Sequence, residues 1–405
     1  MRGAIAMTIC FVILAFAGCS GGGDGTAEEP TAATEPVLGE PLQVVPGDGL
    51  PAEVSLLNAN NNLDVVRHEG RVYLAFRTAP LHFASRRTVM YVVSSEDQRT
   101  WTYETEIAMS TDLREPRFLS WKGRLWLFFA VLGPNPSAFE PGHARVMERL
   151  GDGDWTTPTP FYEDGFIPWR LVPYAGRIWM IGYTGGENIY DMEADPVRIH
   201  WLASEDGESW SPAVGGEAVV LEGGGSETGF SFTEDGAVVA VVRNENGDAD
   251  GWGSKVCRAE ANALDDWRCE SDPRKYDSPL LFNHAGIFWL VGRRNVTETG
   301  NYDLGGDDRT HAQRSFNNQT TYWLEPKRCS LWRVDPESLT VHFETDLPSR
   351  GDTCFASVIE AEPDADHDYD LYNYTSPLDG EDVGWQDGQN GPTLIYRLAL
   401  TLPTQ

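Results

Sequence analysis

A short alternation of apolar and aromatic residues, introduced by glycine, recurs along most of the chain. Copies begin at Gly70, Gly123, Gly176, Gly236 and Gly286, and a sixth, degenerate copy covers residues 369–372. The first three glycines are 53 residues apart, and the next gaps are 60 and 50 residues. A period of two predicts strands with one buried face, and the fixed longer spacing predicts a repeat architecture.

Each copy lies within a unit of four short strands. An apolar strand precedes the glycine, as at residues 118–119 and 230–232, and the unit ends near a tryptophan. These tryptophans are Trp101, Trp155, Trp210 and Trp267, at gaps of 54, 55 and 57 residues. Helical periodicity of useful length is absent. We therefore expect an all-β, six-bladed β-propeller with four antiparallel strands per blade, in which neighbouring blades cover one another's faces.

The N-terminus has the pattern of an export signal. Arg2 precedes an apolar run over residues 5–16, and Ala17 and Gly18 precede Cys19. This pattern predicts a lipoprotein signal peptide over residues 1–18 and a lipid on Cys19. The alternative is an ordinary signal peptide with an incidental cysteine. We expect an exported protein, lipid-anchored to the bacterial membrane and facing the periplasm or the cell exterior.

Composition divides the remaining chain into two parts. Residues 19–50 are rich in Gly, Ala, Thr, Glu and Pro, which predicts a flexible linker after the lipidated cysteine. Residues 51–405 are then expected to form a single propeller domain, whose ring closes where residues 52–57 pair with residues 393–400. We expect a monomer that reaches the membrane only through its lipid.

Four cysteines remain after Cys10 and Cys19 are set aside. They are Cys257, Cys269, Cys329 and Cys354. An even number in an exported protein predicts two disulfides, for which three connectivities are possible. Proximity along the chain favours Cys257–Cys269 and Cys329–Cys354. A zinc site is disfavoured, because the chain has no CxxC pair.

The net charge narrows the possible partners. The formal charge is −31 at pH 7, which argues against nucleic acid and against electrostatic docking on anionic lipid. The same charge disfavours a polyanionic substrate unless a local basic patch overcomes it. A glycan ligand or substrate remains the expected partner.

Two turns carry a family resemblance. Residues 95–101 read Ser-Glu-Asp-Gln-Arg-Thr-Trp and residues 204–210 read Ser-Glu-Asp-Gly-Glu-Ser-Trp. They resemble the Asp-box of sialidases and other BNR-repeat propellers, in which the aspartate accepts backbone hydrogen bonds in a tight turn and the tryptophan packs between blades. Residues 151–155 and 264–267 look like eroded copies. The resemblance covers most of residues 52–400. It implies the fold rather than an activity, because Asp-boxes also occur in propellers that do not cut sugars.

Acidic residues recur where the inner strands of the repeats begin. Alignment of the units places Asp64, Glu115, Glu227, Asp277 and Asp352 at nearly equivalent positions, and the third unit has Trp169 and Arg170 instead. Because inner strands converge on the axis of a propeller, we expect these groups at one mouth of the ring. Two such carboxylates can protonate a leaving oxygen and activate water or attack a sugar. The alternative is that the acids bind backbone donors in the channel.

The ends of the second strands supply another set of side chains. They are Arg77, Val131, Tyr183, Arg243, Arg293 and Tyr374. This set resembles a sialidase site, where three arginines hold the substrate carboxylate, a tyrosine attacks the anomeric carbon, a glutamate activates it and an aspartate is the acid/base. The resemblance implies Glu227 as the glutamate, Arg243 as the second arginine, Arg293 or Arg294 as the third, and Tyr374 or Tyr372 as the nucleophile.

Two positions depart from the sialidase pattern. The first inner strand, residues 62–66, has no arginine, so Arg77 would substitute from the next strand. Residues 78–93 contain no Asp or Glu and offer only His82 as a titratable proton donor. The leading hypothesis is a sialidase-like glycoside hydrolase that acts on extracellular glycans. The alternatives are a propeller glycosidase that uses an acid and base from Asp64, Glu115 and Glu227 on a non-sialic sugar, and a non-catalytic propeller that binds a glycan or a protein.

Other residues near the mouth are candidate substrate contacts. Arg170, Asp277 and Asp352 are expected to bind substrate, and the aromatic rings of Trp169, Tyr183 and Phe230 either stack on sugars or pack the blades.

Two polar insertions, residues 295–323 and 376–392, flank the same face and predict either pocket walls or surface decoration. In the first of them, Arg309, His311 and Arg314 are further candidate contacts. No cofactor or catalytic metal is expected, although the Asp-rich insertions permit a structural calcium ion.

Overall fold

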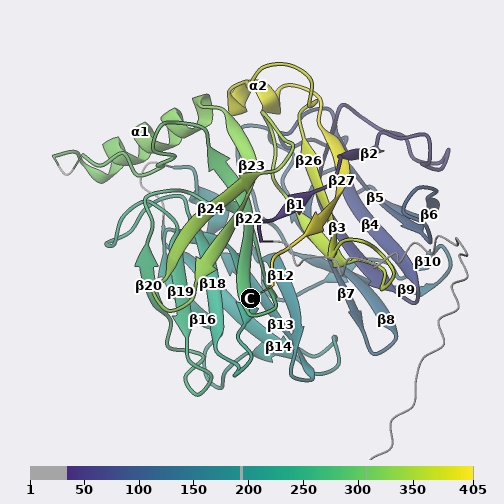
Figure 1. Ribbon diagram of the computed structural model, residues 1–405, viewed down its shortest axis with the longest axis horizontal. Helices are drawn as coiled ribbons and strands as arrows, with labels where there is room; N and C mark the ends of the chain where they lie inside the picture. The colour runs from purple at the N-terminus through teal and green to yellow at the C-terminus, as the bar shows by residue number, and fades with distance from the viewer. Residues whose placement is uncertain (1–33, 192–194, 307, 405) are drawn as a thin grey trace, which may run out of the picture. The chain divides into compact units, whose positions relative to one another are not determined.

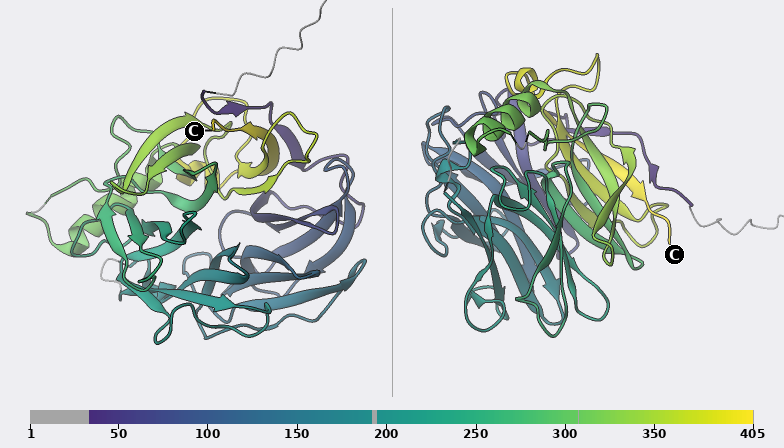
Figure 2. Two further views of the ribbon diagram at one scale, coloured as in Figure 1. Left: turned by 60° about the horizontal axis from the view of Figure 1, so that its bottom comes forward. Right: turned by 90° about the vertical axis from the view of Figure 1, so that its left-hand side faces the viewer.

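The computed structural model describes residues 34–191, 195–306 and 308–404. The predicted signal peptide, Cys19 and the first part of the predicted linker lie outside these residues. The described chain is almost entirely β-structure, in six separate antiparallel sheets. These sheets form a six-bladed β-propeller (Figures 1 and 2), as the repeat predicts.

Each blade is one sheet. In blades 1 to 5 the strands follow chain order from the axis outward, whereas in blade 6 the N-terminal β1 and β2 lie outside β27. Blade 1 contains β3 (Ala59–His68), β4 (Arg71–Ala79), β5 (Val89–Ser95) and β6 (Thr102–Ile107). Blade 2 contains β7 (Asp112–Trp121), β8 (Arg124–Leu132), β9 (Arg145–Gly151), β10 (Asp154–Trp155) and β11 (Thr159–Pro160). Blade 3 contains β12 (Ile167–Tyr174), β13 (Arg177–Thr184), β14 (Val197–Ser204), β15 (Ser211–Pro212) and β16 (Val219–Gly223), with the short η1 (Gly186–Asn188) after β13.

The second half of the ring follows the same plan. Blade 4 contains β17 (Gly225–Phe232), β18 (Val238–Asn244), β19 (Lys255–Ala259) and β20 (Arg268–Ser271). Blade 5 contains β21 (Asp277–His284), β22 (Ile287–Asn295), β23 (Lys327–Asp335) and β24 (Thr340–Asp346). Blade 6 contains β25 (Ser357–Glu360), β26 (Tyr369–Thr375), β27 (Leu394–Thr401), β1 (Val37–Leu38) and β2 (Leu42–Val45).

The recurring glycine occupies a hairpin turn between the first two strands of a blade. Glu69 and Gly70 have φ values of 50° and 78°, and Lys122 and Gly123 have values of 50° and 77°. Two successive positive φ values are typical of a type I′ turn, which matches the twist of the strands it joins. The recurring glycine therefore marks the first hairpin of blades 1 to 5, and blade 6 is marked only by the degenerate copy over residues 369–372.

The ring closes N-terminal to the predicted boundary. Both β1 and β2 pair with β27, with Val37 opposite Thr401 and Leu42 opposite Arg397. The predicted linker over residues 19–50 is therefore wrong at its C-terminal end, because Val45 is fully buried in blade 6. Residues 52–57 form no strand, so the predicted closing segment is also corrected.

Two helices interrupt the β pattern, where the sequence predicted none. The helix α1 (His311–Leu324) lies in the insertion between β22 and β23, and α2 (Trp385–Gln389) lies between β26 and β27. Figure 1 shows both at the upper end of the ring. Thr310 and Gln313 form a capping box at the start of α1, a local signal that the sequence contains.

Disulfides fasten two of the blades. Cys257 in β19 is bonded to Cys269 in β20, and Cys329 in β23 is bonded to Cys354, which precedes β25. These are the two pairs that proximity along the chain favours. The first disulfide lies within blade 4, whereas the second joins blade 5 to the segment that enters blade 6.

The two Asp-box-like turns share one set of hydrogen bonds. Asp97 Oδ1 accepts from the backbone N–H groups of Arg99 and Thr100 at 2.8 and 2.7 Å. Asp206 Oδ1 accepts from those of Glu208 and Ser209 in the same way, at 2.9 and 2.8 Å. Hydrogen bonds from these backbone amides lower the pKa of Asp97 to about 2. The carboxylates stabilise turns, which is the role that the resemblance implies for them.

Candidate functional site

The mouth of the ring is the end where the inner strands begin and the second strands finish. Five inner strands carry a register shift there, namely at residues 61–63, 114–117, 168–170, 225–228 and 277–280. A β-bulge turns side chains out of the regular alternation and is frequent beside active sites. Side chains on neighbouring bulges contact one another, as Asn62 does Glu115, and Glu227 accepts from the Ser278 backbone of the next bulge.

Two carboxylates lie in such bulges. Glu115 is in the bulge of β7 with a φ of 51°, and Glu227 is in the bulge of β17. Arg243 Nη1 donates to Glu227 Oε1 at 2.8 Å, and the backbone N–H of Ser278 donates to Glu227 Oε2 at 2.7 Å. Asn62 Nδ2 donates to Glu115 Oε2 at 3.2 Å. Both oxygens of Glu227 therefore receive donors suited to a carboxylate anion, whereas Glu115 receives one neutral donor.

The two carboxylates differ electrostatically. Burial and then the negative charge of Glu227 raise the pKa of Glu115 to about 7, and the positive charges of Arg117 and Arg114 oppose this rise. With this pKa, Glu115 is partly protonated near neutral pH. Acids and bases kept apart in this way by their surroundings are typical of hydrolytic sites.

Arg117 interacts with both carboxylates through charge, and sequence analysis did not single it out. Its guanidinium stacks between the rings of Trp169 and Phe355, 4.8 and 4.4 Å from their centroids. Within the described part of the chain, none of its three guanidinium nitrogens has a hydrogen-bond partner. Arg117 therefore acts on the carboxylates through charge.

A network of alternating charges joins blades 4 and 5. Arg243 Nε lies 3.1 Å from Asp277 Oδ1, and Arg293 Nη1 donates to Asp277 Oδ2 at 2.9 Å. Tyr322 of α1 also donates to Asp277 Oδ2, at 2.9 Å. Burial opposes ionisation of Asp277, yet Lys275, Arg243 and Arg293 hold its pKa below the ordinary value. The structure thus brings together Glu227, Arg243, Asp277 and Arg293.

Two side chains that sequence analysis missed extend this network. Glu245 accepts from Arg243 and from Lys275, and Lys275 lies 4.5 Å from the ring centroids of both Tyr302 and Tyr322. Their pairing could not be read from the sequence, because Lys275 and Glu245 belong to different blades. Glu245 thus fixes Arg243 directly, and Lys275 is paired with both Glu245 and Asp277.

A second group of side chains lies where blade 6 meets blade 1. Asp352 is completely buried and accepts from His82 Nδ1 at 2.7 Å, from Tyr374 Oη at 3.1 Å and from Trp385 Nε1 at 3.0 Å. Burial and the charge of Asp352 raise the pKa of Tyr374 well above 10. The hydroxyl of Tyr374 thus donates to Asp352, whereas the sialidase resemblance implies a partnership with Glu227.

Arg77 is corrected from a substrate contact to a structural residue. It is fully buried, and its Nη2 donates to Asp112 Oδ1 at 2.7 Å and to the Phe83 carbonyl at 3.0 Å. Asp112 Oδ2 accepts from Arg114 Nε at 2.6 Å. Arg77 therefore holds the carboxylate that orients Arg114, whose side chain is 14% exposed.

Asp64 and Arg170 also tie blades together. Asp64 accepts from the Phe118 backbone and from Ser357 Oγ, both at 2.7 Å. Arg170 donates to the carbonyl oxygens of Pro279 and Ala356 at 3.1 and 3.2 Å. Asp64 is therefore occupied by backbone and hydroxyl donors. This agrees with the alternative expectation that the acids at the mouth bind backbone donors in the channel.

The candidate stacking rings are mostly interior. Trp169 and Phe230 are 0% and 1% exposed and Tyr183 is 2% exposed, so Trp169 and Phe230 pack the channel and blade 4. Tyr190 is the more accessible ring, at 51% exposed, and its hydroxyl accepts from Arg243 Nη2 at 3.4 Å. Tyr190 lies in the segment between β13 and β14, where the sequence carries no strand period that would single it out.

The first insertion contributes a wall through α1. The ring centroid of His311 is 4.7 Å from that of Trp252, and Arg314 donates to Asp303. Lys327 supports the C-terminus of α1, because its Nζ donates to the carbonyl oxygens of Tyr322 and Glu325 and to Asn295 Oδ1. The same insertion thus places Tyr322 against Asp277.

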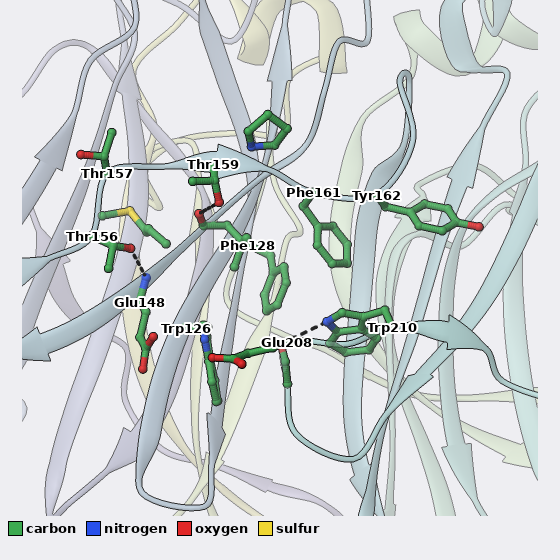
Figure 3. Close-up of a pocket in the computed structure, with 14 residues that line it drawn as sticks. Trp126, Phe128, Glu148, Thr156, Thr157, Thr159, Phe161, Tyr162, Glu208 and Trp210 are labelled. Atoms are coloured by element: carbon green, nitrogen blue, oxygen red, sulfur yellow. Dashed lines mark hydrogen bonds between the residues drawn. The ribbon is translucent and has the colours of Figure 1, made fainter.

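A separate hollow lies away from these residues, between blades 2 and 3. It has a volume of about 560 Å³ and is lined by the rings of Trp126, Phe128, Phe161 and Trp210, with Glu148 and Glu208 at its edge (Figure 3). Trp210 meets Phe128 and Phe161 edge to face, at centroid distances of 5.9 and 5.8 Å. These rings pack neighbouring blades, and none of the predicted site residues lines this hollow.

Across residues 34–191, 195–306 and 308–404, no group of three or more His, Cys, Asp or Glu side chains is arranged to hold a metal ion. In that part of the chain, no helix has the length and apolar character needed to cross a membrane.

Comparison with known proteins gives relatives in structure alone. No family model and no curated protein matches the sequence. A protein of unknown function from Dyadobacter fermentans has a TM-score of 0.59 at 15% identity, over 91% of this chain and 100% of its own. Trypanosoma rangeli sialidase in complex with sialic acid has a TM-score of 0.53 at 12% identity, over 91% of this chain and 59% of its own. Penicillium chrysogenum α-L-arabinanase in complex with arabinobiose has a TM-score of 0.51 at 10% identity, over 90% of this chain and 98% of its own. At these identities the likeness shows a propeller fold that glycosidases also use.

Proposed function

We propose that this protein is a glycoside hydrolase in which Glu115 and Glu227 form the reacting carboxylate pair. The observation that carries the proposal is their unequal environment at one mouth. Glu115 keeps its proton up to about pH 7, and Glu227 accepts from Arg243 and the Ser278 backbone. A protonated and an ionised carboxyl group are the two components that hydrolysis of a glycosidic bond needs.

Each residue has a separate role in this scheme. Glu115 donates its proton to the leaving glycosidic oxygen. The carboxylate of Glu227, held by Arg243 and the Ser278 backbone, faces the positive charge that develops at the anomeric carbon. Its negative charge also raises the pKa of Glu115. Tyr190 offers an accessible ring on which a sugar can stack. A propeller fold shared with a sialidase and an arabinanase is consistent with this chemistry.

Attack by tyrosine, as in sialidases, is the second candidate. It is favoured by Tyr374, whose hydroxyl donates to Asp352 beside Arg293. It is disfavoured by Arg77, which is buried against Asp112 and is not part of the group formed by Arg243 and Arg293. We therefore rank a non-sialic glycoside above a sialoside as substrate.

We further propose the cellular setting that the N-terminal pattern predicts. The chain is exported, carries a lipid on Cys19 and acts as a monomer on glycans outside the cytoplasm, without a cofactor. Labelling of expressing cells with an alkyne fatty acid, in wild type and Cys19→Ser, tests the lipid. Label on both proteins would contradict this attachment site.

A panel of chromogenic glycosides, sialosides included, tests the chemistry. Glu115→Gln is expected to lower kcat/KM by about 10²–10⁴-fold on substrates with poor leaving groups, and by much less on dinitrophenyl glycosides, whose departure needs no proton. Glu227→Gln is expected to lower both rates. Glu96→Gln, on an exposed turn at the other end of blade 1, is the matched control.

The alternatives give different results. Equal rates for Glu115→Gln and wild type on all substrates would overturn the acid role of Glu115. Loss of sialoside hydrolysis in Tyr374→Phe, with Glu115→Gln unaffected, would favour the sialidase mechanism. Glycan binding with no turnover of any sugar would indicate a binding propeller.

A further inference from the structure

His82 and Asp352 form a hydrogen-bonded dyad across the junction of blades 1 and 6. His82 lies in the loop between β4 and β5, and its Nδ1 is 2.7 Å from Asp352 Oδ2. Asp352 is completely buried, and its other oxygen accepts from Tyr374 and Trp385. A carboxylate fixed by two further donors sets the orientation of the imidazole ring that it binds.

The backbone of His82 is fixed as well. Its N–H donates to the Gln389 carbonyl at 3.3 Å, and its carbonyl accepts from Arg114 Nη2 at 2.7 Å. The imidazole meets the rings of Phe83 and Trp385 edge to face, at centroid distances of 6.1 and 6.3 Å. Arg114 directly precedes Glu115 in β7, so one arginine links the dyad to the acid.

The dyad leaves one imidazole nitrogen for chemistry. Because Asp352 accepts a hydrogen bond at Nδ1, the proton resides on Nδ1 and Nε2 keeps its lone pair. Among the residues that the structure describes, His82 Nε2 has no hydrogen-bond partner, and 16% of the side chain is exposed. Glu227, in contrast, has both oxygens engaged by Arg243 and Ser278, which makes it the poorer base.

We propose that His82, oriented by Asp352, is the general base that takes a proton from the attacking water. This inference rests on the proposed glycoside hydrolysis and adds its second proton-transfer group. Asp352 is a positioning residue that also stabilises the imidazolium formed in the reaction.

The step balances with water as the co-reactant. A water O–H bond breaks, its proton goes to His82 Nε2, and its oxygen forms a bond to the anomeric carbon. The glycosidic C–O bond breaks, its electron pair goes to the leaving oxygen, and that oxygen takes the proton of Glu115. Proton exchange with solvent then restores both groups. A single displacement of this kind inverts the anomeric configuration.

The charges around the dyad are consistent with a base at neutral pH. Burial lowers the pKa of His82 below 6.5; Asp352 opposes this, and the charges of Arg114 and Arg77 add to the lowering. The other groups that face the dyad are Tyr374 of β26, Trp385 of α2 and Arg293 of β22, whose positive charge acts on Asp352. Activity is therefore expected between the pKa of His82 and that of Glu115, which is about 7.

Rescue by imidazole tests the base. His82→Ala, with its Tm and circular dichroism checked, is expected to lose 10²-fold or more in kcat and to regain at least 10-fold in 50–200 mM imidazole. His143→Ala, at an exposed histidine with no assigned role, is expected to keep wild-type rates and to show no effect of imidazole. Proton NMR of the sugar released by wild type is expected to show inversion.

The positioning role of Asp352 is tested by the kinetics and the pH profile of an Asp352 variant. Asp352→Asn is expected to lower kcat with little change in KM, and to move the acid limb of the pH profile of kcat/KM downward, because it removes the charge that raises the pKa of His82. Tyr374→Phe removes one hydrogen bond to Asp352 but keeps its charge, and is expected to leave that limb in place.

Two failures are distinguishable. Unchanged turnover in His82→Ala, with Glu115→Gln inactive, overturns the role of His82 alone. A retained anomer in the product also overturns the direct attack of water. No turnover of any glycoside by wild type overturns the proposed function and this role together.

Discussion

Arg77 Nη2 lies 2.7 Å from Asp112 Oδ1, and both side chains are completely buried. The pair joins blade 1 to blade 2, and Asp112 in turn orients Arg114 at the mouth. An arginine that the sequence offers as a ligand for a substrate carboxylate is therefore bound to a carboxylate of the protein itself. Arg77 therefore contributes to the stability of the fold and, through Asp112, to the position of Arg114.

Arg77→Met is expected to lower the free energy of unfolding by about 3–5 kcal/mol, because it leaves a buried carboxylate with one partner fewer. Urea denaturation measures this change. Arg71→Met is the matched control, since Arg71 pairs with Glu96 on the surface and such pairs contribute about 1 kcal/mol or less. Unchanged stability together with a raised KM would instead support a substrate contact.

Glu115 is expected to make stability depend on pH. Its pKa is about 7 in the folded chain and 4.5 in its ordinary state, so the folded chain binds the extra proton between these values. The stability that it contributes is complete below pH 4.5 and is lost as the pH rises through 7.

The size of this effect is about 3 kcal/mol at full extent, since one pKa unit corresponds to roughly 1.4 kcal/mol. Glu115→Gln removes the titration, so its stability relative to wild type is expected to increase from pH 4.5 to pH 8. Thermal unfolding of both proteins across this range measures the difference. Parallel curves would show that Glu115 ionises normally.

Loss of either disulfide is expected to lower stability, whereas only loss of Cys329–Cys354 is expected to lower activity. Each closes a short loop, and its removal by paired Cys→Ser changes is expected to cost about 2–4 kcal/mol of unfolding free energy. Cys329–Cys354 also anchors the segment next to Asp352, where Arg293 Nε donates to the Thr353 carbonyl at 2.7 Å. Loss of this disulfide is expected to lower kcat as well, whereas loss of Cys257–Cys269 is expected to leave kcat unchanged. Equal kinetic effects would contradict this distinction.

Closure of the ring is expected to need residues 34–50. A chain that begins at residue 51 lacks β1 and β2, which removes the buried side chains of Val44 and Val45 and exposes the edge of β27. Burial of one such side chain contributes about 1.5–3 kcal/mol, and an open strand edge favours aggregation. The Tm and the monomer fraction are therefore expected to fall relative to a chain that begins at residue 34. Identical behaviour of the two chains would place the domain boundary at residue 51 after all.

The features that the sequence predicted correctly are local ones. The glycine of each I′ turn and the alternation beside it require only neighbouring residues, so six repeats predicted six blades. The helix α1 was local too, and its capping box at Thr310 and Gln313 could have revealed it. Alignment of the repeats also placed Glu115 and Glu227 at one mouth, because strands of a propeller converge there.

Partnership and ionisation were decided by the tertiary structure. His82 and Asp352 are 270 residues apart, and Arg77 meets Asp112 only because blades 1 and 2 are neighbours. The bulges of the inner strands could not be predicted either. A shift of one residue reverses the direction of a side chain, and the alternation of apolar and polar residues does not reveal where such a shift occurs. The sequence by itself therefore determined the ring and some of the polar residues at its mouth, Glu115 and Glu227 among them, but not Arg117, Glu245 or Lys275. Packing determined which of them are engaged in holding blades together and which are left to donate or accept a proton, because burial and neighbouring charge come from segments distant in the chain.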